Sequence, residues 1–539
     1  YGINHLQISH HNIMDLRHVR NEDRLSVSKK LVEYAHQKGI QEVAFWDHCL
    51  YPLEYYPDKF KTGPNGTINL DNSEFWKWLK NDYRDMLETA PEIEAIILTF
   101  IETGARVEEQ HSENLTSDAE KLAKVVNTIS EVIIDEYNMN LYARTFAYDK
   151  KEYQRIKNAI KLFEYDDIRL MMKETPHDFL FKHPPNPLPS KIDRKTLIEF
   201  DATGEFHGQG IVLNTFPELF ISRWSEFLKR DNIGGYVARM DRYGDTHIVD
   251  RPSEIHAKAI DMYYKDRSTT VMDIYKEFIT NHYGKRAYPM LKEAFQNSKD
   301  ITLSTFYTLN TNTANHSRLN YDPYRSSYAR HVSGRWLEPP VTYVPRSVNK
   351  EFHYWKDIIN TIGPDWAKRG GAQLEECPEV VDKGWLNKQE MMSEKYLKYI
   401  LSEKEYGIEL AKENLIHLEA AKPHLEEEKY KQLYHLFKRT LLTIKLHREV
   451  AAAYWGFRIY SRGEEYRSKY VVSTLDQALK DMLEIAEKIE EYPVEPPKGQ
   501  WTWIEDAKMA KKYHKWITEE GWPKETEGYN VSFGGKTYP

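Results

Sequence analysis

The chain has 539 residues, a formal net charge of −8 and 40% hydrophobic residues, which is enough apolar material for a large buried core and more than one domain. Lysine and arginine are scattered among aspartate and glutamate without a basic stripe, so nucleic acid is excluded as the expected partner. No apolar run reaches the roughly 18 residues of a membrane-spanning helix, which argues against a membrane span. The two cysteines, Cys49 and Cys377, lie far apart in the sequence, which argues against a disulfide framework and a cysteine-based zinc site.

The first half of the chain alternates short β-branched runs with amphipathic helical stretches, a pattern typical of βα units and a parallel sheet. We expect strands at residues 6–9, 42–47, 95–100, 141–146, 168–173, 196–201 and 235–239. We expect helices between them at residues 24–37, 74–87, 117–136, 151–162, 217–230 and 252–264. These strands are one fewer than a closed eight-stranded barrel needs, and a (β/α)8 TIM barrel is the fold class that we predict.

The second half of the chain changes character after about Ser268. Strand signals become rare there, and long charged helical patterns follow at residues 388–421, 426–460 and 472–491. We therefore predict a catalytic barrel domain over residues 1–268 and a mostly α-helical C-terminal domain over residues 269–539. Apolar residues at helical spacing most often mean core packing, and a homodimer through these helices is the alternative.

Three acidic residues follow three separate apolar runs. Glu102 closes the run 96–101, Asp178 follows the run 168–173, and Glu205 follows residues 197–201. Active sites of parallel barrels lie at the carboxyl ends of the strands, and a pair of carboxylates at such a place is what hydrolysis of a glycosidic bond requires. Taken singly, each of these residues is more simply a solvated loop carboxylate or a helix cap.

From Gly2 to about Tyr283, the chain resembles the barrel of glycoside hydrolase family 67, or of a closely related, divergent glycosidase family. The enzymes of family 67 are α-glucuronidases, which remove glucuronic acid or its 4-O-methyl form from xylan-derived oligosaccharides. The stretches that carry the resemblance are residues 2–4, 94–104, 141–148, 172–179 with the trailing Pro187-Leu188, and 197–209. The resemblance implies an inverting mechanism, with Glu102 as the acid and with Asp178 and Glu205 on the positions proposed as base.

The same resemblance places Arg144 and Lys173 on positions that contact the uronate carboxylate, and a guanidinium and an ammonium suit an anionic sugar. The alternative for these two residues is a structural ion pair at the strand ends, neutralising Asp178 or Asp149. The chain departs from the family at Leu98, where the family has a further lysine four residues before the acid. This departure weakens the inference of glucuronic acid but not that of glycoside cleavage.

The chain also departs from the family at its start, because Gly2-Ile3-Asn4 aligns with the second strand of the family barrel. The predicted barrel domain then lacks the first βα unit of the family, and we expect either that Tyr1 is not the natural start or that another segment closes the barrel. Tyr1 to His5 do not read as a signal peptide, although a signal could have been removed. Secretion is left open, with a periplasmic or extracellular location favoured over a cytoplasmic one.

Further substrate-binding candidates surround the three carboxylates in the sequence. Trp46 and Tyr148 are platforms for a sugar ring, His177 and His207 lie beside the proposed bases, and Asp241 follows the last predicted strand. Each has a structural alternative, as a core aromatic, a loop cap or a surface ion pair. No His-x-x-x-His or His-Glu-x-x-His helix accompanies the histidines, so we expect no metal, and we expect no cofactor.

The sequence therefore predicts an inverting, exo-acting α-glucuronidase-like enzyme that acts on a polysaccharide or oligosaccharide. Because of Leu98, an inverting glycosidase for a galacturonide or a neutral α-glycoside stays open as an alternative. A non-catalytic carbohydrate-binding protein on a degenerate barrel is the alternative from another functional class.

Overall fold

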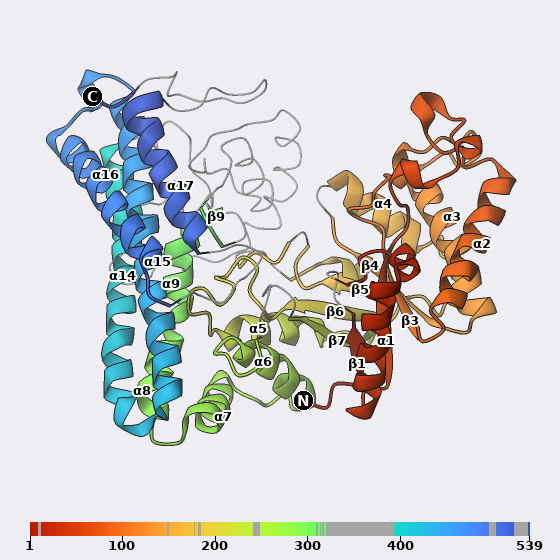
Figure 1. Cartoon of the computed structure of the whole chain (residues 1–539), viewed down its shortest axis with the longest axis horizontal. Helices are drawn as coiled ribbons and strands as arrows, with labels where there is room; N and C mark the ends of the chain where they lie inside the picture. Colours follow the sequence, from red (N-terminus) through yellow and green to blue (C-terminus); the bar gives the residue numbers. More distant parts are fainter. Residues whose placement is uncertain are drawn as a thin grey trace. The chain divides into compact units, whose positions relative to one another are not determined.

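The computed structural model describes residues 1–8, 12–147, 150–176, 178–181, 185–240, 248–308, 311–312, 314, 317–319, 393–494, 503–521 and 537–539 (Figure 1). Chain packing divides them into two compact units. Unit 1 comprises Tyr1–His177, Pro185–Glu199 and Phe227–Val237, and unit 2 comprises Asp178–Pro184, Phe200–Glu226 and Ala238–Pro539. The predicted domain boundary at residue 268 stays a prediction.

A seven-stranded sheet has its strands in the order of the sequence, β1-β2-β3-β4-β5-β6-β7. The strands are β1 (His5–Gln7), β2 (Glu42–His48), β3 (Ala95–Thr99), β4 (Asn140–Thr145), β5 (Arg169–Lys173), β6 (Thr196–Asp201) and β7 (Ile233–Arg239). The pairs from β1 to β6 are parallel. All seven predicted strands are present, whereas the predicted closed eight-stranded barrel is not confirmed, because the sheet of the described residues is a curled half-barrel.

Helices follow β1, β2, β3, β4, β6 and β7, as βα units require. They are α1 (Glu22–Gln37), α2 (Ser73–Thr89), α3 (Asp118–Ser130), α4 (Lys150–Ile160), α5 (Pro217–Phe227) and α6 (Glu254–Lys265). Local capping determines where several of them begin: the Asn21 side chain accepts a hydrogen bond from the backbone N–H of Arg24, and Ser117 and Glu120 form a capping box at α3. A single helix was predicted over 117–136, but its last turn, Glu131–Glu136, is a π-helix.

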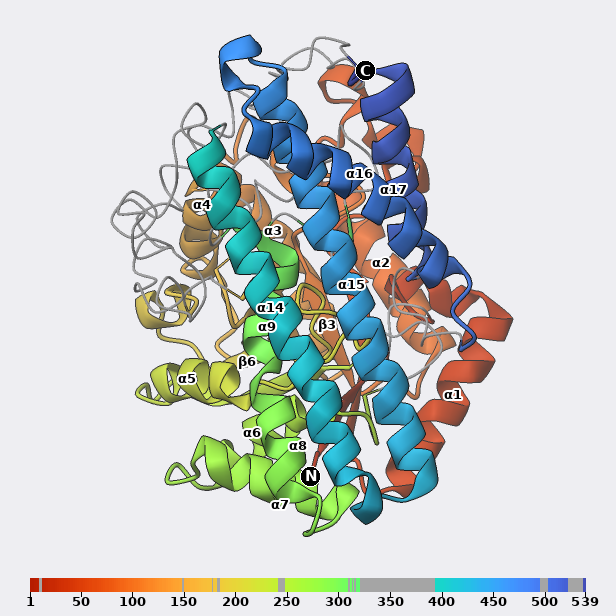
Figure 2. The same cartoon turned by 90° about the vertical axis from the view of Figure 1, so that its left-hand side faces the viewer.

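Unit 2 contains the long helices of the second half. After α7 (Val271–Tyr283), α8 (Tyr288–Gln296), α9 (Ser298–Phe306) and the short pair β8 (Tyr307–Thr308) and β9 (Thr311–Asn312) come α14 (Glu394–Ala421), α15 (Glu427–Tyr460), α16 (Lys469–Glu490) and α17 (Ile504–Lys515). Figure 2 shows α14, α15 and α16 running side by side, and α17 packs against α16. The predicted helical C-terminal region is thus confirmed. No helix in the described part of the chain is long and apolar enough to span a membrane.

Short 3-10 segments lie mainly in the connections. They occupy Leu16–Arg20, Leu53–Tyr55, Asp58–Phe60, Pro64–Gly66, Val107–Glu109, Leu188–Lys191, Lys422–His424 and Glu464–Tyr466, and a second π-helix, Trp516–Glu520, follows α17.

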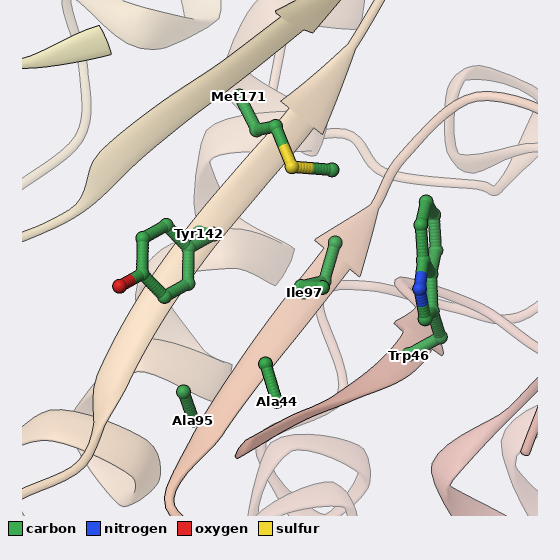
Figure 3. Close-up of a cluster of buried hydrophobic side chains, with 6 residues drawn as sticks. All are labelled: Ala44, Trp46, Ala95, Ile97, Tyr142 and Met171. Carbon is green, nitrogen blue, oxygen red and sulfur yellow. The ribbon is translucent and has the colours of Figure 1, made fainter. Parts of the chain in front are cut away.

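One face of the sheet carries a cluster of buried hydrophobic side chains. Its buried side chains are Ala44, Trp46, Ala95, Ile97, Tyr142 and Met171 (Figure 3). Every second residue of a strand points to the same face, and the register aligns Trp46 with Ile97 and Ile97 with Tyr142. We call this side the inner face. Because of this alternation, every second residue further along each strand also lies on the inner face.

The amino ends of these strands close the inner face with a polar network. The Glu42 carboxylate is hydrogen-bonded to His5 Nδ1 at 2.7 Å, to the Tyr142 hydroxyl at 2.6 Å and to Asn140. Burial raises the pKa of Glu42, but these donors outweigh it and hold the pKa at about 2. Residues at this end of a parallel barrel serve stability rather than catalysis.

Candidate active site

Four side chains of unit 1 lie on the inner face toward the carboxyl ends of the strands. Trp46 is a member of the inner-face core, and Arg144 stands two residues beyond Tyr142 on β4. Lys173 and Glu199 are directly opposite each other in the pairing of β5 with β6. Trp46, Arg144 and Lys173 are candidate site residues of the sequence analysis. Glu199, which the sequence analysis did not single out, lies on the same face.

Arg144 forms a buried, two-pronged ion pair with Glu199. The Nε–Oε2 distance is 2.7 Å and the Nη2–Oε1 distance is 3.0 Å. The guanidinium also lies 4.9 Å from the ring centre of Trp46 and 5.4 Å from that of Phe146. Bidentate pairing together with aromatic stacking fixes the plane of the guanidinium. The sequence analysis allowed a structural pair for Arg144 with Asp178 or Asp149, whereas the structure supplies Glu199 as its partner.

Lys173 adds a second buried cation to this face. Its Nζ lies 3.7 Å from the centre of the Phe146 ring, and the residue is only 4% exposed. An ammonium over an aromatic face is stabilised by the ring quadrupole, more strongly where water is excluded. Arg144 and Lys173 thus bring two basic side chains to the inner face, and basic side chains of this kind suit an anionic group of a ligand.

Glu102 lies three residues beyond the end of β3 and is exposed. Its backbone adopts φ of 61°, in the left-handed region that non-glycine residues rarely enter. Two residues on, Gly104 donates its N–H to the Leu50 carbonyl at 3.1 Å, and a Cβ at Gly104 would lie 2.3 Å from the Pro52 nitrogen. The close approach at Gly104 and the strained backbone at Glu102 define a tight turn; such strain of about 1–3 kcal/mol per residue is concentrated at functional sites.

Asp178 belongs to unit 2, where it begins a buried turn. The Phe179 N–H donates to its Oδ1 at 3.0 Å. Phe179 and the following Leu180 pack against Phe206, the residue next to Glu205. The predicted bases Asp178 and Glu205 are therefore carried by two loops that share one apolar contact.

The loop that carries Glu205 is held by hydrogen bonds from both its own residues and distant ones. The Asp201 carboxylate accepts the Thr203 hydroxyl at 2.6 Å and the Glu205 N–H at 2.5 Å. Arg239 Nη1 lies 3.3 Å from Glu205 Oε2, and the Ser317 hydroxyl donates to the Glu205 carbonyl at 2.7 Å. Glu205 is 3% exposed, so both its backbone and its carboxylate have defined positions.

Two glycines allow the backbone of this loop to turn back on itself. Gly204 has φ of 75° and Gly208 has φ of 110°, and a Cβ on Gly208 would come within 2.3 Å of Val212 Cγ2. Residues with a Cβ would therefore be both strained and crowded at Gly208. The glycine-rich composition of residues 204–210 is the sequence signal for this conformation.

The Asp201 carboxyl group has an unusual environment. Complete burial raises its pKa to about 6, although the positive charge of Arg239 opposes the shift, and the negative charge of Glu205 adds to it. The pKa of Asp201 thus lies above the ordinary value of 3.8 for an aspartate. The sequence analysis assigned Asp201 no separate role, although alternation along β6 places it on the same side of the strand as Leu197 and Glu199.

His207, a predicted substrate contact, is completely buried in unit 2. Its ring meets Phe181 and Phe216 edge-on, each at a centroid distance of 5.5 Å. Burial, with the nearby charges of Arg223 and His256, holds the pKa of His207 well below its usual range, so the ring is neutral. These contacts describe a packing role; its role in substrate binding stays a prediction.

The remaining predicted contacts, Tyr148, His177 and Asp241, lie outside the described residues. Glu102, Arg144, Lys173 and Trp46 belong to unit 1, and Asp178, Glu205 and His207 belong to unit 2. The roles assigned to all these residues stay predictions.

Within the described ranges, Asp250, Glu254 and His282 of unit 2 bring metal-binding atoms within 4.8 Å of one another. Glu254 Oε2 already accepts the Asp250 N–H at 2.6 Å, which is a local arrangement at the start of α6. Exposed acidic groups of this kind are common without an ion, so the cluster does not identify a metal centre.

Comparisons with known proteins relate the fold to glycoside hydrolases. No family model matches the chain, and no curated protein matches it. A solved structure described as a GH138 enzyme targeting pectin rhamnogalacturonan II is similar to this chain, with 11% identity and a TM-score of 0.53 over 91% of the chain and 57% of that protein. The chain thus spans little more than half of that protein, and at this identity the similarity shows a shared fold alone.

A second solved structure is described as a GH115 4-O-methyl-α-glucuronidase with specificity for decorated arabinogalactans. It has 9% identity and a TM-score of 0.41 over 88% of this chain and 52% of its own. A likeness at this TM-score supports no conclusion. The structure that shares the fold, at a TM-score of 0.53, is described as a GH138 enzyme, a glycoside hydrolase of another family than family 67.

Proposed function

We propose that the protein is a glycoside hydrolase that removes a uronic acid from a polysaccharide or oligosaccharide by an inverting, exo-acting mechanism. The observation that carries the proposal is that acidic side chains follow β3, β5 and β6 where these strands end: Glu102, Asp178 and Glu205. The carboxyl ends of parallel strands are where enzymes of this architecture hold their catalytic groups. The fold shared with a GH138 enzyme supports the same class of reaction.

In this proposal Glu102 protonates the leaving oxygen, and Asp178 and Glu205 orient and deprotonate the attacking water. Inversion requires the acid and the base to stand about 6.5–9.5 Å apart, so that water fits between the base and the sugar. The exposed, strained position of Glu102 suits a group that must meet a glycosidic oxygen. The buried, hydrogen-bonded position of Glu205 suits a base whose carboxylate must stay aligned.

The two basic side chains of the inner face suit an anionic sugar. Arg144 and Lys173 are both buried there. We propose that the carboxylate of a glucuronic acid, free or 4-O-methylated, is recognised by Arg144 and Lys173 and that Trp46 supports the sugar ring. The variant Lys173→Met, which removes the ammonium group, should therefore weaken the binding of a uronide more than the binding of a neutral glycoside.

A galacturonide is the second candidate substrate. Leu98 replaces a lysine of family 67, which takes one cation away from the pattern for glucuronic acid. The structurally similar GH138 enzyme is described as targeting pectin rhamnogalacturonan II, so a pectic oligosaccharide belongs in the same test. A neutral α-glycoside remains the substrate to be compared against both.

The test is sugar release from matched oligosaccharides that differ only in the terminal residue: glucuronic acid, 4-O-methylglucuronic acid, galacturonic acid and the corresponding neutral hexose. We expect the parent chain to release a uronic acid. In Lys173→Met, kcat/KM for the uronide should fall at least about 10-fold, in line with the 1.5–3 kcal/mol of a charge-assisted hydrogen bond. For any neutral substrate, kcat/KM of the same variant should be nearly unchanged. Release of neutral sugar alone would contradict the proposed substrate, and binding without release would favour a non-catalytic carbohydrate-binding protein.

A further inference from the structure

Asp201 occupies a place next to the proposed base that neither the motifs nor the proposed mechanism uses. It is the last residue of β6, it is completely buried, and its two carboxylate oxygens are divided between two donors. Oδ1 accepts the Thr203 hydroxyl at 2.6 Å, and Oδ2 accepts the Glu205 N–H at 2.5 Å. The strand end is thus tied directly to the backbone of Glu205.

The side chain of Glu205 is held from a second direction. Arg239, the last residue of β7, places Nη1 3.3 Å from Glu205 Oε2, and its guanidinium lies 5.1 Å from the ring centre of Phe179. The charged groups that act on Asp201 are the same two residues, Arg239 and Glu205. The Arg239 guanidinium therefore acts on both carboxyl groups, and Asp201 in addition accepts the backbone N–H of Glu205.

Other donors hold the carbonyl of Glu205 rather than its N–H. The Glu205 carbonyl accepts from Ser317 and from Gln209 Nε2 at 3.1 Å, and these bonds hold the opposite side of the peptide chain. Gly204, immediately before Glu205, has φ of 75°, a conformation from which glycine can readily depart. Without the acceptor at Asp201, the Glu205 N–H loses this hydrogen bond, and the glycine before it tolerates the change of backbone angles that can follow.

We infer that Asp201 is a positioning residue that holds the Glu205 carboxylate in line for water activation. The inference rests on the proposed function, in which Glu205 acts on the attacking water, and it adds a residue that does not itself touch substrate. Its action is geometric: the hydrogen bond to the Glu205 N–H sets the backbone, and the shared Arg239 sets the direction of the carboxylate. A displacement of about 1 Å at such a group costs about 100-fold in rate.

The test compares Asp201→Ala with two matched variants. Asp201→Asn keeps an oxygen acceptor for the Glu205 N–H and nearly the same shape, and Thr203→Val removes only the donor to the other oxygen. We expect kcat to fall about 100-fold in Asp201→Ala with KM changed less than about 3-fold. We expect Asp201→Asn to recover at least about 10-fold of that loss, and Thr203→Val to keep kcat within about 3-fold of the parent.

A crystal structure of each variant provides a readout that does not depend on turnover. In Asp201→Ala the Glu205 carboxylate should leave Arg239, whereas in Asp201→Asn it should stay. Unchanged kcat in a folded Asp201→Ala, or a Glu205 carboxylate that keeps its place there, would overturn the inference. If Asp201→Ala does not fold, a kcat of Asp201→Asn as low as that of Glu205→Gln would overturn it instead.

The same set of proteins separates this inference from the proposed function. A parent that releases sugar, a Glu205→Gln that does not and an Asp201→Ala that still does would leave the function intact and remove only the positioning role. A parent that releases no sugar from any substrate would overturn the proposed function, and with it the catalytic meaning of the Asp201 contact.

Discussion

At the scale of single residues, the inner face holds a buried ion pair between Arg144 and Glu199. A buried Arg144 is tolerable because Glu199 meets it with two hydrogen bonds and because Trp46 and Phe146 cover its plane. Desolvating two charges is costly, and the pair makes up for this cost only while both partners are present. The pair is thus a fixed element of the site, and its loss should affect stability as well as binding.

Glu199→Gln should destabilise unit 1 strongly, because it leaves the Arg144 guanidinium buried without its counter-charge. We expect the free energy of unfolding to fall by about 3–5 kcal/mol, the usual effect of removing one partner from a buried ion pair. Urea unfolding followed by tryptophan fluorescence measures it. Glu33→Gln, on the exposed surface of α1, is the control and should change stability by less than about 0.5 kcal/mol. Equal effects of the two substitutions would show that the Arg144–Glu199 pair contributes nothing.

Sequence patterns located the candidate residues along the strands but could not specify their partners. Alternation places Arg144 and Glu199 on one face, yet they are 55 residues apart and lie on strands separated by β5. Which side chains meet across an intervening strand depends on register and rotamer, and neither leaves a local sequence signal. For the same reason the sequence does not reveal Asp201 as a partner of Glu205, although both residues belong to the stretch 197–209.

At the scale of secondary-structure elements, the sequence predicted all seven strands, and the errors lie at their ends. β7 begins at Ile233, two residues before the predicted start at Gly235, because adjacent glycines read as a turn while the sheet extends through both. The predicted helix 117–136 continues through a π-helical turn whose hydrogen bonding has no compositional marker. Periodicity thus identifies elements well, and tertiary packing decides their boundaries.

The amino ends of β1, β2 and β4 should make unit 1 sensitive to acid. The pKa of Glu42 is about 2 in the folded chain, against an ordinary value of 4.5, so its stabilisation is present above pH 4.5 and is lost as the pH falls toward 2. The difference corresponds to on the order of 3 kcal/mol.

Glu42→Gln is the variant that isolates this effect. We expect it to be less stable than the parent at pH 7 and to converge with it as the pH approaches 2, in urea unfolding measured across that range. A gap between the two proteins that stays constant with pH would contradict this account of Glu42.

The helices of unit 2 approach each other closely at one glycine. A Cβ on Gly407 of α14 would lie 2.4 Å from Ile444 Cδ1 of α15 and 2.5 Å from Ser304 Cβ of α9. Overpacking in Gly407→Ala should cost unit 2 about 1–3 kcal/mol of stability, and the gain in helix propensity should return about 1 kcal/mol. We therefore expect a net loss of stability.

Gly456→Ala in α15 is the matched control for Gly407→Ala. Its added Cβ would meet the nearest heavy atom, Leu475 Cβ, at 3.5 Å, an ordinary contact, so only the propensity gain should remain. Thermal unfolding of the two variants should give melting temperatures that move in opposite directions. A stabilised Gly407→Ala would contradict the close packing of α14 between α9 and α15.

At the scale of the whole molecule, the two units are interlaced in sequence. The boundaries after Glu199 and after Val237 fall inside β6 and β7, so these two strands contribute residues to both units. Sequence composition, which changes near Ser268, contains no signal for a boundary that runs through strands. The predicted homodimer and the predicted compartment stay predictions at this scale. The proposed release of a uronic acid is the claim that can be tested most directly.

That test is NMR of sugar release with resolution of the two anomers, on the parent chain and on Glu102→Gln. The account predicts that a uronic acid appears first as the β-anomer from an α-linked substrate. Release should be lost in Glu102→Gln with natural oligosaccharides and partly kept with an activated leaving group, which needs no proton. A first product in the α-anomeric form, or undiminished release by Glu102→Gln from natural oligosaccharides, would contradict the inverting mechanism with Glu102 as the acid.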